Sequence, residues 1–360
     1  MRLRAAALAA AISLLVLPAA ARQAASPSFA STVASLSEPG GYFDTDNLVS
    51  NESSYLQVIP DLAKRGVHGG AYLGVGPDQN FTYIAAVRPS VAFIVDIRRD
   101  NLLLQLLFKA LFKTSGTRIE YLSLLFGRQT PPNPDAWRAA AIDKIASRVD
   151  SAPRVDAAAL DGRLMRTMQA FGVPLSQDDL RTIRRFHQSF VDAGLSMRFQ
   201  STGRPPQRYY PTFGEMLVDT DSSGRQSNFL ASEDAFQLVR GLENRDLVIP
   251  VVGDLGGPTA VAAIGRYLAA RNERVSAFYV SNVEFYLFRE GTFPRFVTNL
   301  QRLPHSSGSV LIRSIFAGRF GFGGGRPGDD SVSALQPIDD VLSQYAGGRI
   351  RMYADLIGRQ

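Results

Sequence analysis

The sequence contains no cysteine and only three histidines in its 360 residues. The absence of cysteine excludes disulfide bonds, thiol nucleophiles, thiolate metal sites and a lipid anchor attached to an acylated cysteine. The histidines, His68, His187 and His305, lie far apart and do not form the His-Glu-x-x-His pattern of a zinc site. We therefore predict no metal centre, and we expect packing alone to stabilise the fold.

Signature motifs of several common enzyme classes are also absent. The sequence has neither the Gly-x-Ser-x-Gly turn of α/β-hydrolases nor the Gly-x-x-x-x-Gly-Lys-Ser/Thr loop that binds nucleotide phosphates. Its net charge of +6 is small for this length, and its arginines are scattered and form no basic run with aromatic residues. We therefore predict that the protein does not bind nucleic acid.

The N-terminus has the pattern of a processing segment. Arg2 and Arg4 precede an apolar run over residues 5–17, and small residues follow at 18–21. The run is shorter than the roughly 20 apolar residues that a membrane-spanning helix needs. We predict a cleaved signal peptide at residues 1–25 and a linker at 26–41, so the mature protein is exported to the periplasm or secreted, without stable membrane insertion. An uncleaved N-terminal membrane anchor is the alternative.

After Tyr42, apolar runs of strand length alternate with helical segments, which is typical of a parallel sheet covered by helices on both faces. The predicted strands are 70–76, 91–96, 119–126, 247–252, 275–280, 310–316 and 350–356. Residues 127–245 contain helical stretches without strands, which indicates an insertion. We predict an α/β fold, a Rossmann-like three-layer sandwich with a seven-stranded, mostly parallel sheet and antiparallel last strands. Its two halves lie at residues 42–126 and 246–360.

A glycine motif follows the first predicted strand. Gly74 and Gly76 lie at its end, and Asp96 ends the second strand, about 20 residues further on. In a βαβ unit such glycines let the backbone approach a ligand, and an acid at this spacing accepts hydrogen bonds from ribose hydroxyls. We predict that Gly74, Gly76, Asp78 and Asp96 bind a nucleoside-type small molecule. Alternatively, the glycines only make a tight turn and Asp96 caps the next helix.

Polar residues also follow two later strands. Asp254 comes after the strand at 247–252, and Asn282 and Glu284 come after the strand at 275–280. Ligands of open parallel sheets bind outside the carboxyl ends of the strands. We therefore predict that these three side chains converge with Asp96 and are catalytic, orienting a substrate or acting as a general base. Helix capping or a loop hydrogen bond is the alternative for each of them.

A cluster of acidic and amide residues precedes the first predicted strand and can close over the crevice. Its members are Asp44, Asp46, Asn47, Asn51 and Glu52. Cation binding through oxygen ligands, or turn and capping roles, are the alternatives. Tyr209 and Tyr210, beside two prolines, are candidates to line a pocket, with ordinary loop packing as the alternative.

With seven predicted strands, glycines after the first and an acid after the second, the chain resembles the class I S-adenosylmethionine-dependent methyltransferases over about residues 66–126 and 246–357. The resemblance implies that the cofactor is S-adenosylmethionine, with its methionine part near Gly74 and Gly76 and its ribose on Asp96. It also implies that the last two strands form an antiparallel pair. The family has an acid and a third glycine where this chain has Tyr72 and Asp78.

Two functions are compatible with these features. The first is a methyltransferase-like protein of unknown acceptor, in which Asp254 or Glu284 orients the acceptor toward the sulfonium. The alternative is an exported, non-catalytic Rossmann-like protein that binds another small molecule or a protein partner, which Tyr72, Asp78 and the signal segment favour. A dinucleotide oxidoreductase is disfavoured, because Gln79 stands where its motif needs a third glycine.

Overall fold

The structure, a computed structural model, describes residues 27–204, 207–316, 326 and 329–358. The signal peptide predicted at residues 1–25 lies outside this part of the chain. Within it, no helix combines the length and the apolar character needed to cross a membrane.

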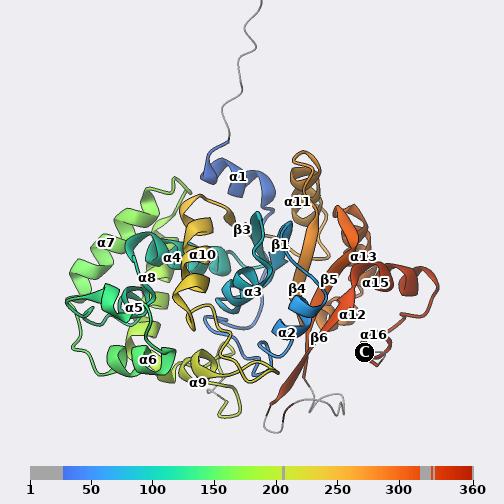
Figure 1. Ribbon diagram of the computed structural model, residues 1–360. Coiled ribbons are helices and arrows are strands. Elements are labelled where there is room, and N and C mark those ends of the chain that lie inside the picture. The colour runs from blue at the N-terminus through green and yellow to red at the C-terminus, as the bar shows by residue number, and fades with distance from the viewer. Residues whose placement is uncertain (1–26, 205–206, 317–325, 327–328, 359–360) are drawn as a thin grey trace, which may run out of the picture.

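A six-stranded sheet built from the described residues forms the centre of the molecule (Figure 1). Its strands are β1 (Ala71–Gly74), β2 (Val91–Asp96), β3 (Val248–Val252), β4 (Val275–Ser281), β5 (His305–Phe316) and β6 (Ser331–Pro337). They lie in the order β3-β2-β1-β4-β5-β6, with the first five parallel and β6 antiparallel to β5. The predicted α/β class and mostly parallel sheet are confirmed, whereas the prediction of seven strands is wrong.

Strand β2 explains why the central strands are so apolar. Residues Val91 to Val95 are all buried, and β2 pairs with β1 on one side and with β3 on the other. Because helices cover both faces of the sheet, side chains that point either way enter the core. The continuous apolar run therefore predicted this strand with its correct ends.

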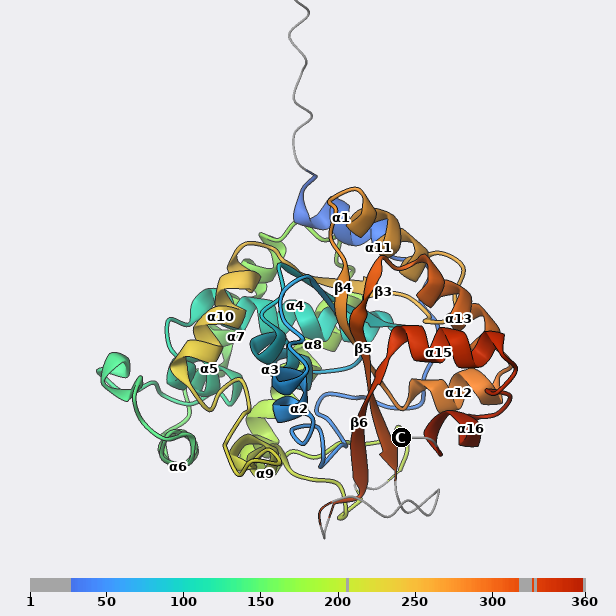
Figure 2. The same ribbon diagram turned by 45° about the vertical axis from the view of Figure 1, so that its right-hand side comes forward.

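Helices cover both faces of the sheet, which gives three layers (Figures 1 and 2). One face carries α3 (Gln79–Val87) and α4 (Arg99–Thr114), on which α2 (Ile59–Lys64) and α10 (Glu233–Asn244) pack. The other face carries α1 (Phe29–Leu36), α11 (Ala260–Ala269), α13 (Phe293–Arg302) and α15 (Ile338–Ala346). Helix α12 (Val283–Arg289) packs on α13, and α16 (Tyr353–Ile357) packs on α12.

The segment 127–245 adds helices outside α4. It contains η1 (Pro134–Trp137), α6 (Ile142–Asp150), α7 (Ala157–Gln169), α8 (Gln177–Ala193), η2 (Gly194–Ser196), α9 (Phe213–Val218) and α10. Its described residues contribute no strand to the sheet, as predicted for a helical insertion. Residues 101–112 of α4 are all buried, because the sheet covers one side of this helix while α7, α8 and α10 cover the other.

Two segments predicted as strands, residues 119–126 and 350–356, are largely helical instead. Residues 119–126 belong largely to α5 (Arg118–Leu125), which starts with a cap formed by Thr117 and Glu120. The Thr117 hydroxyl accepts from the Glu120 N–H, while the Glu120 carboxylate accepts from the Gly116 N–H at 2.8 Å. This local satisfaction of backbone donors outweighs the β-like composition of the segment.

The C-terminal part of the sheet also differs from the prediction. Residues 350–356 form a bend followed by α16, and the Asp355 carboxylate accepts from the N–H groups of Arg351 and Met352, which precede the helix. The antiparallel partner of β5 is β6, which was not predicted. Polar residues such as Ser331, Ser333 and Gln336 occupy much of β6, since this strand lies at the edge of the sheet.

The predicted linker at 26–41 contains helix α1, so that prediction is wrong for residues 29–36. Val33 and Leu36 of α1 are buried, and the helix packs against β3 and α11. Beyond α1 the chain runs along the carboxyl ends of β3 and β2, where the Glu38 N–H donates to Val252 and the Gly41 N–H to Ile97. The next residues are thereby held over the carboxyl edge of the sheet.

Candidate functional site

A cavity of about 630 Å³ lies at the carboxyl ends of β1, β2, β3 and β4. Its floor, as we use the word, consists of the strand-end segments 75–76, 95–98, 253–255 and 281–283. Its roof consists of lining residues from two other segments, 42–52 and 199–210. The volume is within the range of small-molecule sites, and β1 and β4 are the neighbours at which the strand order of the sheet reverses, the usual place for a ligand.

Four of the seven predicted site residues line this cavity: Gly76, Asp96, Asp254 and Asn282. The other three, Gly74, Asp78 and Glu284, do not. The four lining residues stand at the end of a strand or within two residues after it. Asp78 and Glu284 lie further along, at the starts of the helices that follow, and Gly74 ends β1 without reaching the cavity.

The two glycines after β1 have different roles. Gly76 has a φ of +83°, a conformation that favours glycine, and lies against Asn47 of the roof. A Cβ at Gly74 would collide with the side chains of Asn80 and Tyr72. Asn80 donates to the carbonyls of Val75 and Pro77 at 2.9 and 2.8 Å, and it accepts from the Tyr72 hydroxyl at 2.8 Å. Gly74 thus serves the turn, while Gly76 faces the cavity.

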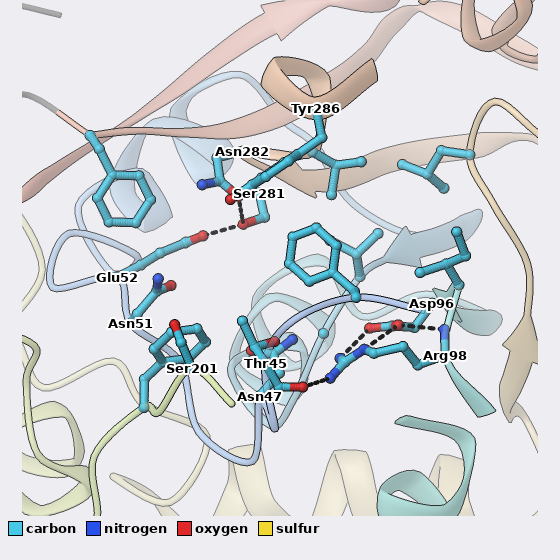
Figure 3. Close-up of a pocket in the computed structure, with 18 of the residues that line it drawn as sticks. Thr45, Asn47, Asn51, Glu52, Asp96, Arg98, Ser201, Ser281, Asn282 and Tyr286 are labelled. Atoms are coloured by element: carbon cyan, nitrogen blue, oxygen red, sulfur yellow. Dashed lines mark hydrogen bonds and ion pairs between the residues drawn. The ribbon is translucent and has the colours of Figure 1, made fainter. Parts of the chain in front are cut away.

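Asp96 forms a two-point ion pair with Arg98. The guanidinium donates from Nε to Oδ1 at 3.0 Å and from Nη2 to Oδ2 at 2.9 Å, and the Arg98 N–H donates to Oδ1 at 2.9 Å. Both side chains are only about a tenth exposed, at 10% and 9%. Arg98 also donates from Nη1 to the Thr45 carbonyl at 2.7 Å, so it joins the floor of the cavity to its roof (Figure 3).

Glu52 is the second buried carboxylate on the cavity wall. Its Oε2 accepts from the Tyr279 hydroxyl at 2.6 Å and its Oε1 accepts from the Ser281 hydroxyl. The Tyr279 hydroxyl in turn accepts from Gln79 Nε2 at 3.1 Å. Burial raises the pKa of Glu52, while these hydroxyl donors oppose the shift. Figure 3 shows Glu52 and Ser281 on one side of the cavity and the Asp96–Arg98 pair on the other.

Aromatic contacts hold the roof in place. Phe43 packs edge to face on Tyr286 of α12, with ring centroids 4.8 Å apart. Tyr210 contacts the tilted ring of Tyr209 and packs edge to face on Phe199 within the second roof segment. The two roof segments are linked by an ion pair of 3.3 Å between Arg204 and Asp44. The exposed rings of Tyr42 and Tyr209 belong to the cavity lining as well.

The sequence matches a family described as Domain of unknown function (DUF7790) over residues 47–148 and 206–345. This chain belongs to the DUF7790 family. Helices α7 and α8 and the start of the second roof segment lie between the two matched ranges and are not matched. The whole floor of the cavity and Glu52 lie within the matched ranges. A search of curated proteins found no match to the chain.

In this DUF7790 member, two of the predicted site residues, Glu284 and Asp78, are buried but do not line the cavity. Glu284 is 1% exposed and pairs with Arg313 of β5, whose Nη2 lies 3.0 Å from Oε1. Asp78 lies at the start of α3 and is 8% exposed, and burial raises its pKa to about 7. The expectation that Glu284 converges on the crevice with Asp96 is therefore wrong.

The polar cluster before β1 closes over the cavity, as one of its predicted roles required. Asn47, Asn51 and Glu52 line the cavity, whereas Asp44 and Asp46 do not. Tyr209 and Tyr210 are also in the lining, which is one of the two roles considered for them. Across the described ranges, no three His, Cys, Asp or Glu residues are grouped so as to hold a metal ion.

Sequence reasoning missed Arg98, Ser281 and Phe43. Arg98 follows Asp96 by two residues, and an arginine so close to a strand-end acid was a readable signal. Ser281, with a φ of +52°, turns the chain sharply at the end of β4, which no sequence pattern indicates. Phe43 lines the cavity, and the chain before it is held on the strand ends by the hydrogen bonds of Glu38 and Gly41, which no sequence pattern indicates.

Proposed function

We propose that this protein is methyltransferase-like and binds a nucleoside-type small molecule in the cavity, with S-adenosylmethionine as the first candidate. The observation that carries the proposal is the position of the cavity beside the β1–β4 neighbours, with Gly76 and Asp96 on its wall. The strand order is also that of the dinucleotide-binding fold, but the two βαβαβ halves of that fold make its sixth strand parallel. Because β6 is antiparallel to β5, this choice is favoured over a dinucleotide oxidoreductase.

Asp96 retains capacity to bind a ribose. Within the described residues, its Oδ2 accepts one hydrogen bond, from Arg98, and a carboxylate oxygen has a second lone pair. A ribose hydroxyl donating to that position would complete the hydrogen bonds of the carboxylate. Arg98 would then hold the carboxylate in a fixed orientation toward the ligand.

In methyl transfer, the protein mainly positions the acceptor atom in line with the sulfonium. Asn282 and Asp254 line the cavity and provide polar groups for an acceptor. The Asp254 carboxylate already accepts the Gly256 N–H at 2.8 Å, so its orientation is fixed before a ligand arrives. We therefore assign the positioning of the acceptor to Asp254 and Asn282, whereas the sequence predicted Asp254 or Glu284 for this role.

A second candidate is a non-catalytic binding protein for another small molecule. The Asp96–Arg98 pair favours it, because three hydrogen bonds from Arg98 already occupy most of the carboxylate that a ribose would use. Tyr72 favours the second candidate too, because it stands where the methyltransferases have an acid and its hydroxyl donates to Asn80. For either candidate we propose a location outside the cytoplasm, on the basis of the N-terminal segment.

Calorimetric titration of the purified protein with S-adenosylmethionine and S-adenosylhomocysteine tests the proposal. We expect saturable binding that Asp96→Asn weakens by about 1–3 kcal/mol, the cost of a lost buried hydrogen-bond partner. Asp61→Asn on the exposed side of α2 removes the same charge away from the cavity and should leave binding unchanged. Absence of binding at millimolar ligand would overturn the methyltransferase-like proposal in favour of the second candidate.

A further inference from the structure

The cavity wall carries an excess of acidic side chains. The acidic lining residues are Glu52, Asp96, Asp254, Glu290 and Asp330. The basic lining residues found in the described part of the chain are Arg98 and Arg204, and each is engaged by an aspartate. The lining therefore presents net negative charge to whatever occupies the cavity, although the chain as a whole has a net charge of +6.

Glu52 is the acid that most lacks compensation. It is 1% exposed, and within the described ranges no Lys, Arg or His lies within ion-pair distance of its carboxylate. Its partners are the neutral hydroxyls of Tyr279 and Ser281. A buried carboxylate without a cation is costly, and such a group normally pairs or becomes protonated.

Among the described residues, every other buried acid except Asp78 lies within ion-pair distance of a cation. Glu284 pairs with Arg313, and Glu243 lies 3.4 Å from the ammonium of Lys109. Asp78 has no such pair in the described residues, but it does not line the cavity. Glu52 is thus distinguished by being both uncompensated and part of the cavity wall.

We propose that Glu52 is the counter-ion for a positively charged group of the ligand, so that the cavity selects a cationic small molecule such as an amine or a sulfonium. The proposal deepens the proposed function and rests on it for the nucleoside part of the ligand. Because Glu52 and Asp96 stand on different sides of the cavity, the ligand is bound at two points (Figure 3). Its hydroxyl groups meet Asp96, and its cation meets Glu52.

The geometry at Glu52 suits this role. The hydroxyls of Tyr279 and Ser281 occupy one position on each carboxylate oxygen and hold the group in place without neutralising it. Gln79, which donates to Tyr279, fixes the direction of the tyrosine proton toward Glu52. A cation entering the cavity would find the carboxylate already desolvated and oriented, which strengthens the attraction.

Matched pairs of neutral and cationic nucleosides test the inference in calorimetry near neutral pH. The pairs are adenosine with its 5′-amino derivative, and S-adenosylhomocysteine with S-adenosylmethionine. We expect wild-type protein to bind the more cationic member of each pair about tenfold more tightly. Glu52→Gln should bring the two affinities close together. Glu273→Gln is the control, because it removes the same charge just before the start of β4, at the end of the strand away from the cavity. This variant should keep the wild-type ratio.

A measurement without ligand tests the same point. Thermal unfolding of wild type and Glu52→Gln is compared near pH 5 and near pH 8. Because burial raises the pKa of Glu52, wild type loses the contribution of Glu52 to stability as pH rises through that pKa. The glutamine variant lacks this contribution and shares all the others, such as that of Asp78, so the difference between the two proteins reports on Glu52. The other titratable groups facing Glu52 are Tyr72, Tyr83, Tyr279 and Tyr353, whose pKa values are raised above 10.0 and which stay neutral throughout. We expect Glu52→Gln to melt at a higher temperature near pH 8, with a smaller difference near pH 5.

The outcomes separate this inference from the proposed function. Equal affinity of wild type for both members of each pair, unchanged by Glu52→Gln, overturns the inference and leaves nucleoside binding intact. If no nucleoside binds, the proposed function fails, and the melting comparison alone tests whether Glu52 is a buried carboxylate without a compensating cation. A glutamine variant that melts below wild type by the same amount at both pH values overturns the inference, because Glu52 would then be a structural acceptor.

Discussion

Arg98 holds both carboxylate oxygens of Asp96 and, through Nη1, the carbonyl oxygen of Thr45. One guanidinium therefore joins the end of β2 to the segment that covers it. This link helps to hold the roof segment 42–52, because that segment contains no helix or strand of its own. The residue that resembles a ribose-binding acid is thus also part of the closure of the site.

Arg98→Ala should lower the free energy of unfolding by about 3–5 kcal/mol, because it leaves the buried carboxylate of Asp96 without its cation. Arg98→Lys should cost less, since lysine keeps the charge but loses the two-point geometry. Urea unfolding measures both changes. Proteolysis of folded protein should also cut the roof segment faster in the alanine variant. Equal stability of all three proteins would contradict the role assigned to Arg98.

Gly74→Ala should destabilise the protein by about 1–3 kcal/mol, because the added methyl group meets Asn80 and Tyr72 in a packed interior. Gly241→Ala provides the opposite control. Gly241 lies within α10, where a Cβ meets nothing within 4 Å, so alanine should stabilise the helix by about 0.5–1 kcal/mol. Denaturant midpoints of the two variants should therefore move in opposite directions, and a shared direction would refute the packing argument.

Glu284→Gln should lower the free energy of unfolding by about 3 kcal/mol while leaving ligand affinity unchanged. The substitution leaves Arg313 buried without a balancing charge, yet Glu284 does not line the cavity. Unfolding in urea and calorimetric titration of the same samples separate the two effects. A loss of affinity in a variant that is still folded would restore Glu284 to the site.

Asp78 should make the protein less stable as pH rises. Its pKa in the folded state is about 7, above the ordinary value of 3.8, so its contribution is complete below about pH 4 and is lost as pH rises through 7. Asp78→Asn keeps a side chain suited to the start of a helix and removes the charge. We expect the variant to gain about 2 kcal/mol relative to wild type near pH 8 and little near pH 4. A constant difference across this range in urea unfolding would show that the carboxyl is not buried as described.

Much of the fold could be predicted from local patterns in the sequence. The apolar run of β2 depends on neighbours in the sequence, and this strand lies where it was predicted. The helical stretches expected within residues 127–245 are helices as well, α7 and α8 among them. The predictions failed where two local signals competed. At residues 119–126 the composition favoured a strand, but the cap at Thr117 and Glu120 produced a helix. At β6 the polar residues of an edge strand concealed its periodicity.

The amino-acid sequence was sufficient to place Gly76, Asp96, Asp254 and Asn282 on one rim, because the carboxyl ends of parallel strands meet at one edge of a sheet. It was not sufficient to decide which acids are free to meet a ligand. Only the tertiary structure pairs Glu284 with Arg313, engages Asp96 with Arg98, and brings Glu52 against Tyr279 without a cation. The reason is physical: burial and ion pairing join residues far apart in the chain, and neither spacing nor composition records those distances.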